Sequence, residues 1–319
     1  MLLDVCYKKN SNSNSTQLKI PMNGLAFAKH FAIAGQYYEP KITKIPRILG
    51  IFLMYSLYLE RDAFCNENRF SEPRPEFSDP TQKSQFSNLA GRAIADFLSK
   101  RIDNCCFTVN YEAAMRRENL QIKGKRADLI GFTSNGEKIS IEAKGFSTSS
   151  ISEEKMKKYK TQAQEGGLHC KYSVACVSYN LYNRVKCNYY DPEGEDNEFD
   201  KELLKELTKN YYSGLKRFLE LGVEYQIKEF SSEEFYVINL RKIALKIFFK
   251  YESYRDFDFF AYEFLYSYYL ILPKKIDVYS ESGLDNSLEP FEKFLEHDDI
   301  YIDNDRVGLC NIKAIEKQS

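Results

Sequence analysis

Residues 124–146, GKRADLIGFTSNGEKISIEAKGF, hold two short apolar stretches on either side of a turn sequence, and this segment decides the fold. The alternation of side chains predicts strands at 127–133 and 138–144. Residues two apart on a strand share a face, so Glu142 and Lys144 point to one side. Ile139, Ile141 and Ala143 point to the other side.

The length of the turn decides whether Asp128 joins Glu142 and Lys144. A two-residue Asn135-Gly136 loop pairs position 128 with 143, whereas a three-residue loop from Ser134 to Gly136, with Gly136 left-handed, pairs 128 with 142. Asn-Gly alone favours the shorter loop. Only the longer loop gathers one uniformly apolar face, made of Ala127, Leu129, Gly131, Ile139, Ile141 and Ala143, and a one-residue slip turns all of them over. We therefore predict the three-residue loop, with Asp128, Glu142 and Lys144 on one face.

Two carboxylates and one ammonium group on one sheet face suit the binding of a divalent cation. Neighbouring carboxylates repel each other unless a cation lies between them. Mg²⁺ binds one or two carboxylates, keeps several waters and uses substrate phosphate as a further ligand. The alternative is a surface hairpin with an ordinary Glu–Lys ion pair, which short motifs of this kind form often by chance.

The elements around the hairpin alternate between helix and strand. Helical spacing of apolar residues predicts a helix over 86–102, and apolar runs predict strands at 106–111 and 172–179. A further helix is predicted over 153–164. The predicted order is helix, three strands, helix, strand, which indicates an α/β fold with a mixed sheet.

This segment resembles the PD-(D/E)xK nuclease superfamily, whose restriction-endonuclease-like core has the order αβββαβ. Ala127-Asp128 stands where the family often has Pro-Asp, and Glu142-Ala143-Lys144 stands for (D/E)xK. The resemblance covers about residues 85–180. It implies a Mg²⁺-dependent nuclease, with Mn²⁺ as a substitute, in which Asp128, Glu142 and the Ala143 carbonyl bind the metal and Lys144 orients the attacking water.

The resemblance extends, with less specific signals, to residues outside the hairpin. Glu112, expected at the end of the first strand, stands where many members place a further acid beside the metal; an ordinary strand-end Glu is the alternative. Lys160, Gln162 and Gln164 lie on the expected helix after the hairpin, where members have residues that reach the site.

The resemblance implies an endonuclease that hydrolyses DNA, in the role of a restriction or anti-phage defence effector. Two alternatives stay open: a catalytically inactive module of the same fold that binds nucleic acid or is structural, and an RNA-cleaving nuclease. Degenerate members typically lose the Asp or the Lys, and both are present here.

A basic cluster precedes the hairpin and is the candidate for binding phosphates that flank the scissile one. Its members are Arg116, Arg117, Lys123, Lys125 and Arg126. A solvated loop is the alternative. The first half of the chain is also the more basic: residues 1–150 carry 21 Lys and Arg against 15 Asp and Glu, and residues 151–319 carry 24 against 31.

Three regions are expected along the chain: a mainly helical N-terminal accessory region (1–80), the nuclease-like core (81–192) and an α+β C-terminal accessory region (193–319). The C-terminal region is expected to pack on the core or to bind a second copy or a partner protein. The amphipathic helix at 199–221 and the aromatic block at 248–269 are expected to form core or interface. The acidic residues Asp298, Asp299, Asp303 and Asp305 are expected on a solvated surface.

Composition excludes several classes of protein. The 319 residues are 43% hydrophobic with a formal net charge of −1, which excludes wholesale disorder and a strong global attraction to nucleic acid. Eight scattered cysteines suit reduced thiols better than a disulfide scaffold. The start of the sequence lacks the pattern of a signal peptide, and the longest apolar block is about 12 residues where a membrane span needs about 20. We expect a soluble cytoplasmic protein.

Overall fold

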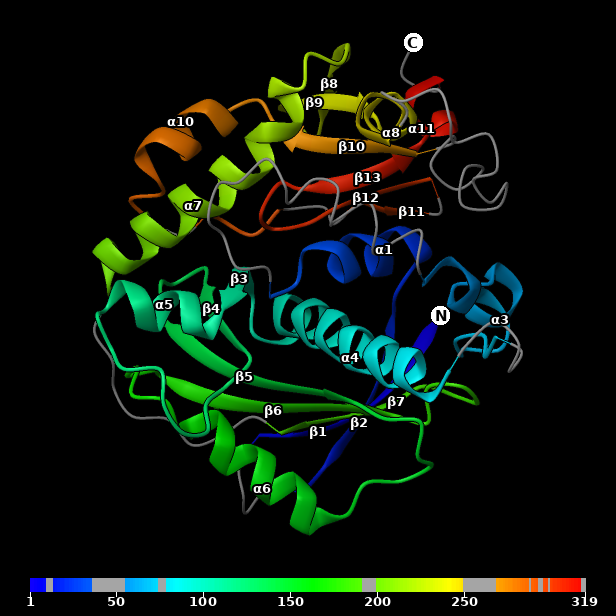
Figure 1. Ribbon diagram of the computed structural model, residues 1–319, viewed down its shortest axis with the longest axis vertical. Coiled ribbons are helices and arrows are strands. Elements are labelled where there is room, and N and C mark those ends of the chain that lie inside the picture. Colours follow the sequence, from blue (N-terminus) through cyan, green and yellow to red (C-terminus); the bar gives the residue numbers. More distant parts are fainter. Residues whose placement is uncertain are drawn as a thin grey trace.

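The computed structural model of the chain describes residues 1–9, 14–35, 55–73, 79–190, 199–248, 268–286, 288–291, 295–297 and 299–316. The described residues form two β-sheets, and helices pack on the sheets and between them (Figure 1). This confirms the mixed α/β class expected from the sequence. Most of the aromatic block, residues 249–267, lies outside the described residues.

The larger sheet contains the predicted hairpin. It has seven strands in the order β2-β1-β7-β6-β5-β4-β3, with parallel pairs β5–β6 and β1–β7 and antiparallel pairs elsewhere. Its strands are β1 (Leu2–Lys8), β2 (Thr16–Pro21), β3 (Cys105–Asn110), β4 (Leu129–Thr133), β5 (Lys138–Gly145), β6 (Tyr172–Tyr179) and β7 (Lys186–Tyr190).

Two long helices cover the centre of this sheet. Helix α4 (Pro80–Ile102) lies on one face and α6 (Glu153–Gln164) on the other, so side chains on both faces of β4 and β5 are buried (Figure 1). Asp79 caps α4 ahead of Pro80, and Ser152 caps α6. The order α4, β3, β4, β5, α6, β6 is the predicted one. A short helix that was not predicted from the sequence, α5 (Tyr111–Arg117), follows β3.

Two glycines bring α4 into backbone contact with β5. A Cβ atom on Gly145 would lie 1.9 Å from the Ser87 carbonyl oxygen, and a Cβ on Gly91 would lie 2.4 Å from the Gly145 nitrogen. Side chains at these positions would push the helix away from the strand that carries Glu142 and Lys144. Gly91 and Gly145 therefore set the distance between α4 and β5.

Residues 2–8 and 16–21 are strands of the large sheet, although the N-terminal region was expected to be mainly helical. Strand β1 pairs with β7 on one side and β2 on the other, and Leu3 and Val5 of β1 are fully buried. Strand β1 is short, and its place in the sheet depends on pairing with β7, whose residues follow their β1 partners 182 positions later. Helix α1 (Gly24–Ile33) and the short α3 (Arg61–Cys65) are the described α-helices of residues 1–80 that precede α4.

The C-terminal region forms the second sheet, of six strands in the order β11-β12-β13-β10-β9-β8. Helix α7 (Lys201–Glu220) buries an apolar face that includes Leu203, Leu204 and Leu207, as the sequence predicts. The remaining elements are β8 (Tyr225–Phe230), β9 (Glu233–Asn239), α8 (Leu240–Phe248), β10 (Tyr268–Pro273), α10 (Ile276–Ser282), β11 (Leu295–His297), β12 (Ile300–Ile302), β13 (Gly308–Asn311) and α11 (Ile312–Glu316).

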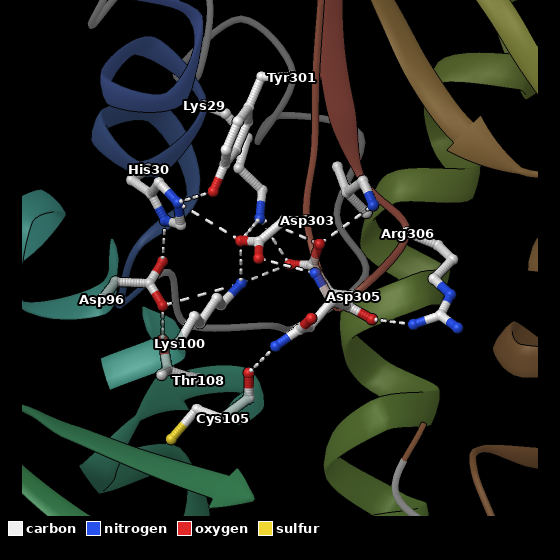
Figure 2. Close-up of polar contacts among 12 residues, drawn as sticks. Lys29, His30, Asp96, Lys100, Cys105, Thr108, Tyr301, Asp303, Asp305 and Arg306 are labelled. Carbon is white, nitrogen blue, oxygen red and sulfur yellow. Dashed lines mark hydrogen bonds and ion pairs between the residues drawn. The ribbon is translucent and has the colours of Figure 1, made fainter. Parts of the chain in front are cut away.

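A buried cluster of charges joins the two sheets through α1 and α4. Lys29 on α1 and Lys100 on α4 both donate to carboxylates of the β12–β13 turn, with Lys29 Nζ and Lys100 Nζ each 2.8 Å from Asp303 Oδ2 (Figure 2). Lys100 Nζ also lies 2.8 Å from Asp305 Oδ2. Each of these side chains is at most 2% exposed. Buried charges are tolerated only when paired and hydrogen-bonded, and this cluster meets both conditions.

The same cluster continues through His30 on α1. Its Nδ1 lies 2.7 Å from Asp96 Oδ2 and its Nε2 lies 2.8 Å from the Tyr301 hydroxyl (Figure 2). Thr108 donates to the second oxygen of Asp96. Burial, which outweighs the attraction of Asp96, lowers the pKa of His30. Closed to solvent on all sides, the cluster is part of the core.

The expectation of a solvated acidic surface is therefore wrong for Asp303 and Asp305. They are 0% and 1% exposed, at the tip of a hairpin that points into the molecule against α1, α4 and α7 (Figures 1 and 2). Tyr211 of α7 donates to Asp305 Oδ2 at 2.7 Å. The sequence around the tip looks like any polar turn, and only long-range partners make its burial stable.

Among the described helices, none combines the length and apolar content that a membrane span requires.

Candidate active site

The register of the β4–β5 hairpin is the one predicted from the sequence. Leu129 pairs with Ile141 and Gly131 with Ile139, so position 128 stands opposite 142. The Thr133 amide donates to the Glu137 carbonyl, which leaves Ser134, Asn135 and Gly136 as the three-residue loop. Gly136 has φ +80°, in the left-handed region that glycine adopts without strain.

The two faces of β5 meet different helices. Gly145, on the face of Ile139 and Ile141, lies against Ser87 of α4. Ser140 is on the other face, where its hydroxyl donates to the Ala163 carbonyl of α6 at 2.7 Å. Because Glu142 and Lys144 follow Ser140 at intervals of two, they lie on the α6 side of the sheet.

Asp128, Glu142 and Lys144 are in direct contact there. Lys144 Nζ lies 2.9 Å from Asp128 Oδ2 and 2.6 Å from Glu142 Oε1. The Ala143 amide also donates to Asp128 Oδ2, at 3.0 Å, which fixes the Asp128 carboxylate against β5. The backbone of Asp128 is held from both sides, since its amide donates to the Ile141 carbonyl and its carbonyl accepts from the Tyr111 amide.

The carboxylate of Glu142 is fully buried and poorly satisfied. Its relative exposure is 0%, and neither Oε atom has a hydrogen-bond partner of good geometry, although the Lys144 ammonium is in ion-pair contact with Oε1. The strand neighbour of Glu142 on β6 is Ala175, part of a small apolar cluster with Met156 of α6. Burial, and then the Asp128 carboxylate, raises the pKa of Glu142 to about 8 despite the attraction of Lys144.

Lys144 keeps its proton more firmly than an ordinary lysine. Burial lowers its pKa, but the carboxylates of Asp128 and Glu142 outweigh burial and raise the pKa above the ordinary value. Lys144 is therefore an ammonium group at neutral pH. Its side chain is 24% exposed and that of Asp128 is 26% exposed, so solvent or a substrate reaches this side of the cluster.

The residues present fit a hard divalent cation. Neither buried oxygen of Glu142 has a hydrogen bond of good geometry, although Oε1 contacts the Lys144 ammonium, and Asp128 uses only Oδ2 in the contacts described above. Among the described residues, no group of three or more His, Cys, Asp or Glu side chains converges on a point where a metal could be held. Two carboxylates completed by water and phosphate oxygens form the ligand set typical of Mg²⁺ rather than of zinc.

Glu112 lies in the first turn of α5 and not at the end of a strand as expected, because β3 ends at Asn110. Its carboxylate forms an ion pair with Arg126, two residues before Asp128. The structure thus brings together Glu112, expected near a metal, and Arg126, expected on phosphate. A signal for α5 was present in the sequence: Asn110 as cap, Glu112 in the first turn and Arg116 and Arg117 in the last.

The other members of the basic cluster are spread over α5 and the segment before β4. Arg117 forms an ion pair with Glu206 of α7, at 3.4 Å. Lys123 and Lys125 are exposed. Of the α6 residues, Gln162 donates to the Arg126 carbonyl and Lys160 to the Ser173 carbonyl, while Gln164 is exposed.

Comparison of the chain with models of protein families, with curated proteins and with solved structures found no match.

Proposed function

We propose that this chain is a metal-dependent nuclease that hydrolyses phosphodiester bonds, with Asp128, Glu142 and Lys144 as its catalytic residues. The observation that carries the proposal is the Glu142 carboxylate, which is fully buried between Asp128 and Ala175, has no hydrogen bond of good geometry and contacts the Lys144 ammonium through Oε1. Such a group destabilises the fold unless it binds something. In the buried ion pair of Lys29 with Asp305, by contrast, both carboxylate oxygens accept a hydrogen bond.

Asp128 and Glu142 are the residues that would hold Mg²⁺, with Mn²⁺ as a substitute. Bound there, the cation supplies Lewis-acid polarisation of a phosphate oxygen. The role of the Ala143 carbonyl as a further ligand rests on the resemblance alone.

Lys144 acts as a hydrogen-bond donor and a positive charge. Since its pKa is raised, the ammonium keeps its proton, orients the attacking water and compensates the charge that develops on the phosphoryl oxygens. The proton that the water loses therefore goes to another acceptor, a phosphate oxygen or solvent, and not to Nζ.

DNA is the proposed substrate, and RNA is the alternative, because nothing in the three residues distinguishes the two sugars. A defence role, as a restriction or anti-phage effector, belongs to the same proposal. We place the protein in the cytoplasm: all eight cysteines are free, and five of them are buried, as suits a reducing compartment.

The test is hydrolysis of plasmid, linear duplex, single-stranded DNA and RNA, with Mg²⁺, with Mn²⁺ and with EDTA. We expect cleavage with either metal and none with EDTA, and a loss of at least about a hundredfold in rate for Asp128→Asn, Glu142→Gln and Lys144→Met. Lys138→Met, which removes a lysine on the same strand that pairs with Asp200, is the control and keeps its activity. Cleavage by folded Asp128→Asn at the wild-type rate, or no cleavage of any substrate by the wild type, contradicts the proposal.

A further inference from the structure

Helix α6 has two flanks that face different parts of the large sheet. On one flank, Glu153 accepts from the Tyr190 hydroxyl of β7 and Lys160 donates to the start of β6. On the other flank, Gln162 donates to the Arg126 carbonyl, two residues before Asp128. The second flank is therefore the one beside the candidate active site.

Two lysines share the flank of Gln162. At about 100° per residue, Lys155 and Lys158 lie within about 40° of Gln162 around the helix axis, whereas Lys157 lies on the flank of Glu153. The rise from Lys155 to Gln162 is about 10 Å, the axial length of about three nucleotides of one strand. Lys125 extends this row of charges at its C-terminal end, because it precedes Arg126, whose carbonyl Gln162 binds.

The lysines of this row are exposed and have no ion pair among the described residues. Glu154, one turn before Lys158, is exposed and forms no ion pair with it in the described structure. The arginines of the basic cluster differ, because Arg126 is paired with Glu112 and Arg117 with Glu206. Charges already paired within the protein gain less from a phosphate than charges in water do.

We propose that the α6 flank formed by Lys155, Lys158 and Gln162, continued by Lys125, binds the phosphate backbone of nucleic acid beside Asp128 and Lys144. The proposal rests on the proposed function for the identity of the site, and it names the surface that holds the substrate. Lysines on a helix flank contact phosphates as point charges and read no base edges, so binding is independent of sequence.

The test is the salt dependence of binding to a 30-base-pair duplex in EDTA, where no hydrolysis occurs. Removal of one lysine–phosphate interaction lowers the slope of log K against log salt by about 0.9. Lys155→Gln and Lys158→Gln are each expected to lower the slope by about that amount, and the double variant by about 1.8, for two unrelated sequences. Lys157→Gln, a change of the same charge on the opposite flank of the same helix, is the control and leaves the slope unchanged.

Unchanged slopes in the double variant, an equal decrease in Lys157→Gln, or no binding of the duplex by the wild type would each overturn the proposal. Thermal unfolding of each variant checks that α6 is intact. The outcome is separate from that of the hydrolysis assay. If the lysine variants lower the slope but the wild type cleaves no substrate, the binding surface is supported and the nuclease proposal is wrong. If the wild type cleaves but the slopes are unchanged, the nuclease proposal is supported and the binding surface is wrong.

Discussion

Lys29 donates to both carboxylate oxygens of Asp305, 276 residues later in the chain, at 3.0 and 2.7 Å. This contact links the helix that follows the first strand pair to the tip of the β12–β13 hairpin. Through Lys100 it also includes α4, the helix that packs on the strand of the candidate active site. The N-terminal and C-terminal regions are thus joined to the core by buried charges.

Removal of one partner from this cluster is expected to destabilise the whole protein. Asp305→Ala leaves the ammonium groups of Lys29 and Lys100 short of a counter-charge in the core, at a loss of about 3–5 kcal/mol in the free energy of unfolding. Urea unfolding measures it. Lys201→Ala, which removes an exposed ion pair with Asp285, is the control and changes the stability by less than about 1 kcal/mol. A decrease in the free energy of unfolding of Asp305→Ala as small as that of the control would contradict the buried, paired arrangement of these charges.

The contact between α4 and β5 is expected to tolerate no side chain. Gly145→Ala places a methyl group 1.9 Å from the Ser87 carbonyl oxygen, so the helix must move, with a loss of about 3 kcal/mol. Gly24→Ala is the matched control, since a Cβ there meets no atom within 4 Å and alanine favours the helix. The two variants should therefore shift the urea midpoint in opposite directions. Equal midpoints would contradict the close approach.

The stability of the metal-free protein is expected to fall between about pH 5 and pH 8 through Glu142. With a pKa of about 8 in the folded state and 4.5 ordinarily, the folded protein holds a proton that the unfolded chain releases. Stability therefore falls with rising pH in this window, by at most about 1.4 kcal/mol per pH unit. Glu142→Gln removes this contribution. The free energy of unfolding of the wild type and of Glu142→Gln is measured in urea at each pH. In the difference between the two values the opposite effect of His30 cancels. A constant difference would contradict a raised pKa.

Mg²⁺ is expected to stabilise the protein more at high pH than at low pH. Glu142 must lose its proton to bind a cation, so the apparent affinity rises from about pH 6 to pH 9. Thermal unfolding with and without Mg²⁺ should show a larger increase in Tm at about pH 8.5 than at about pH 6. The increase should vanish in Glu142→Gln, while Lys138→Met keeps it. An equal shift in Tm for Glu142→Gln would place the bound cation elsewhere.

The local parts of the fold and the face shared by Asp128, Glu142 and Lys144 could be predicted from the sequence. Only one register of β4 against β5 places Leu129, Ile139 and Ile141 on a shared apolar face, and a turn of three residues with glycine at its end allows it. The interactions involved span fewer than 20 residues. Caps at Asp79 and Ser152 likewise mark the starts of α4 and α6 within the chain itself.

Tertiary structure decided the rest. The burial of Asp303 and Asp305 depends on Lys29 and Lys100, and the place of β1 in the sheet depends on β7. In each case a charged or short segment is stable only beside a partner far along the chain, and one-dimensional patterns carry no information on that distance. The sequence by itself determined which residues form the candidate site; the packing of α6 and Ala175 decided that Glu142 is buried there, where its charge destabilises the protein.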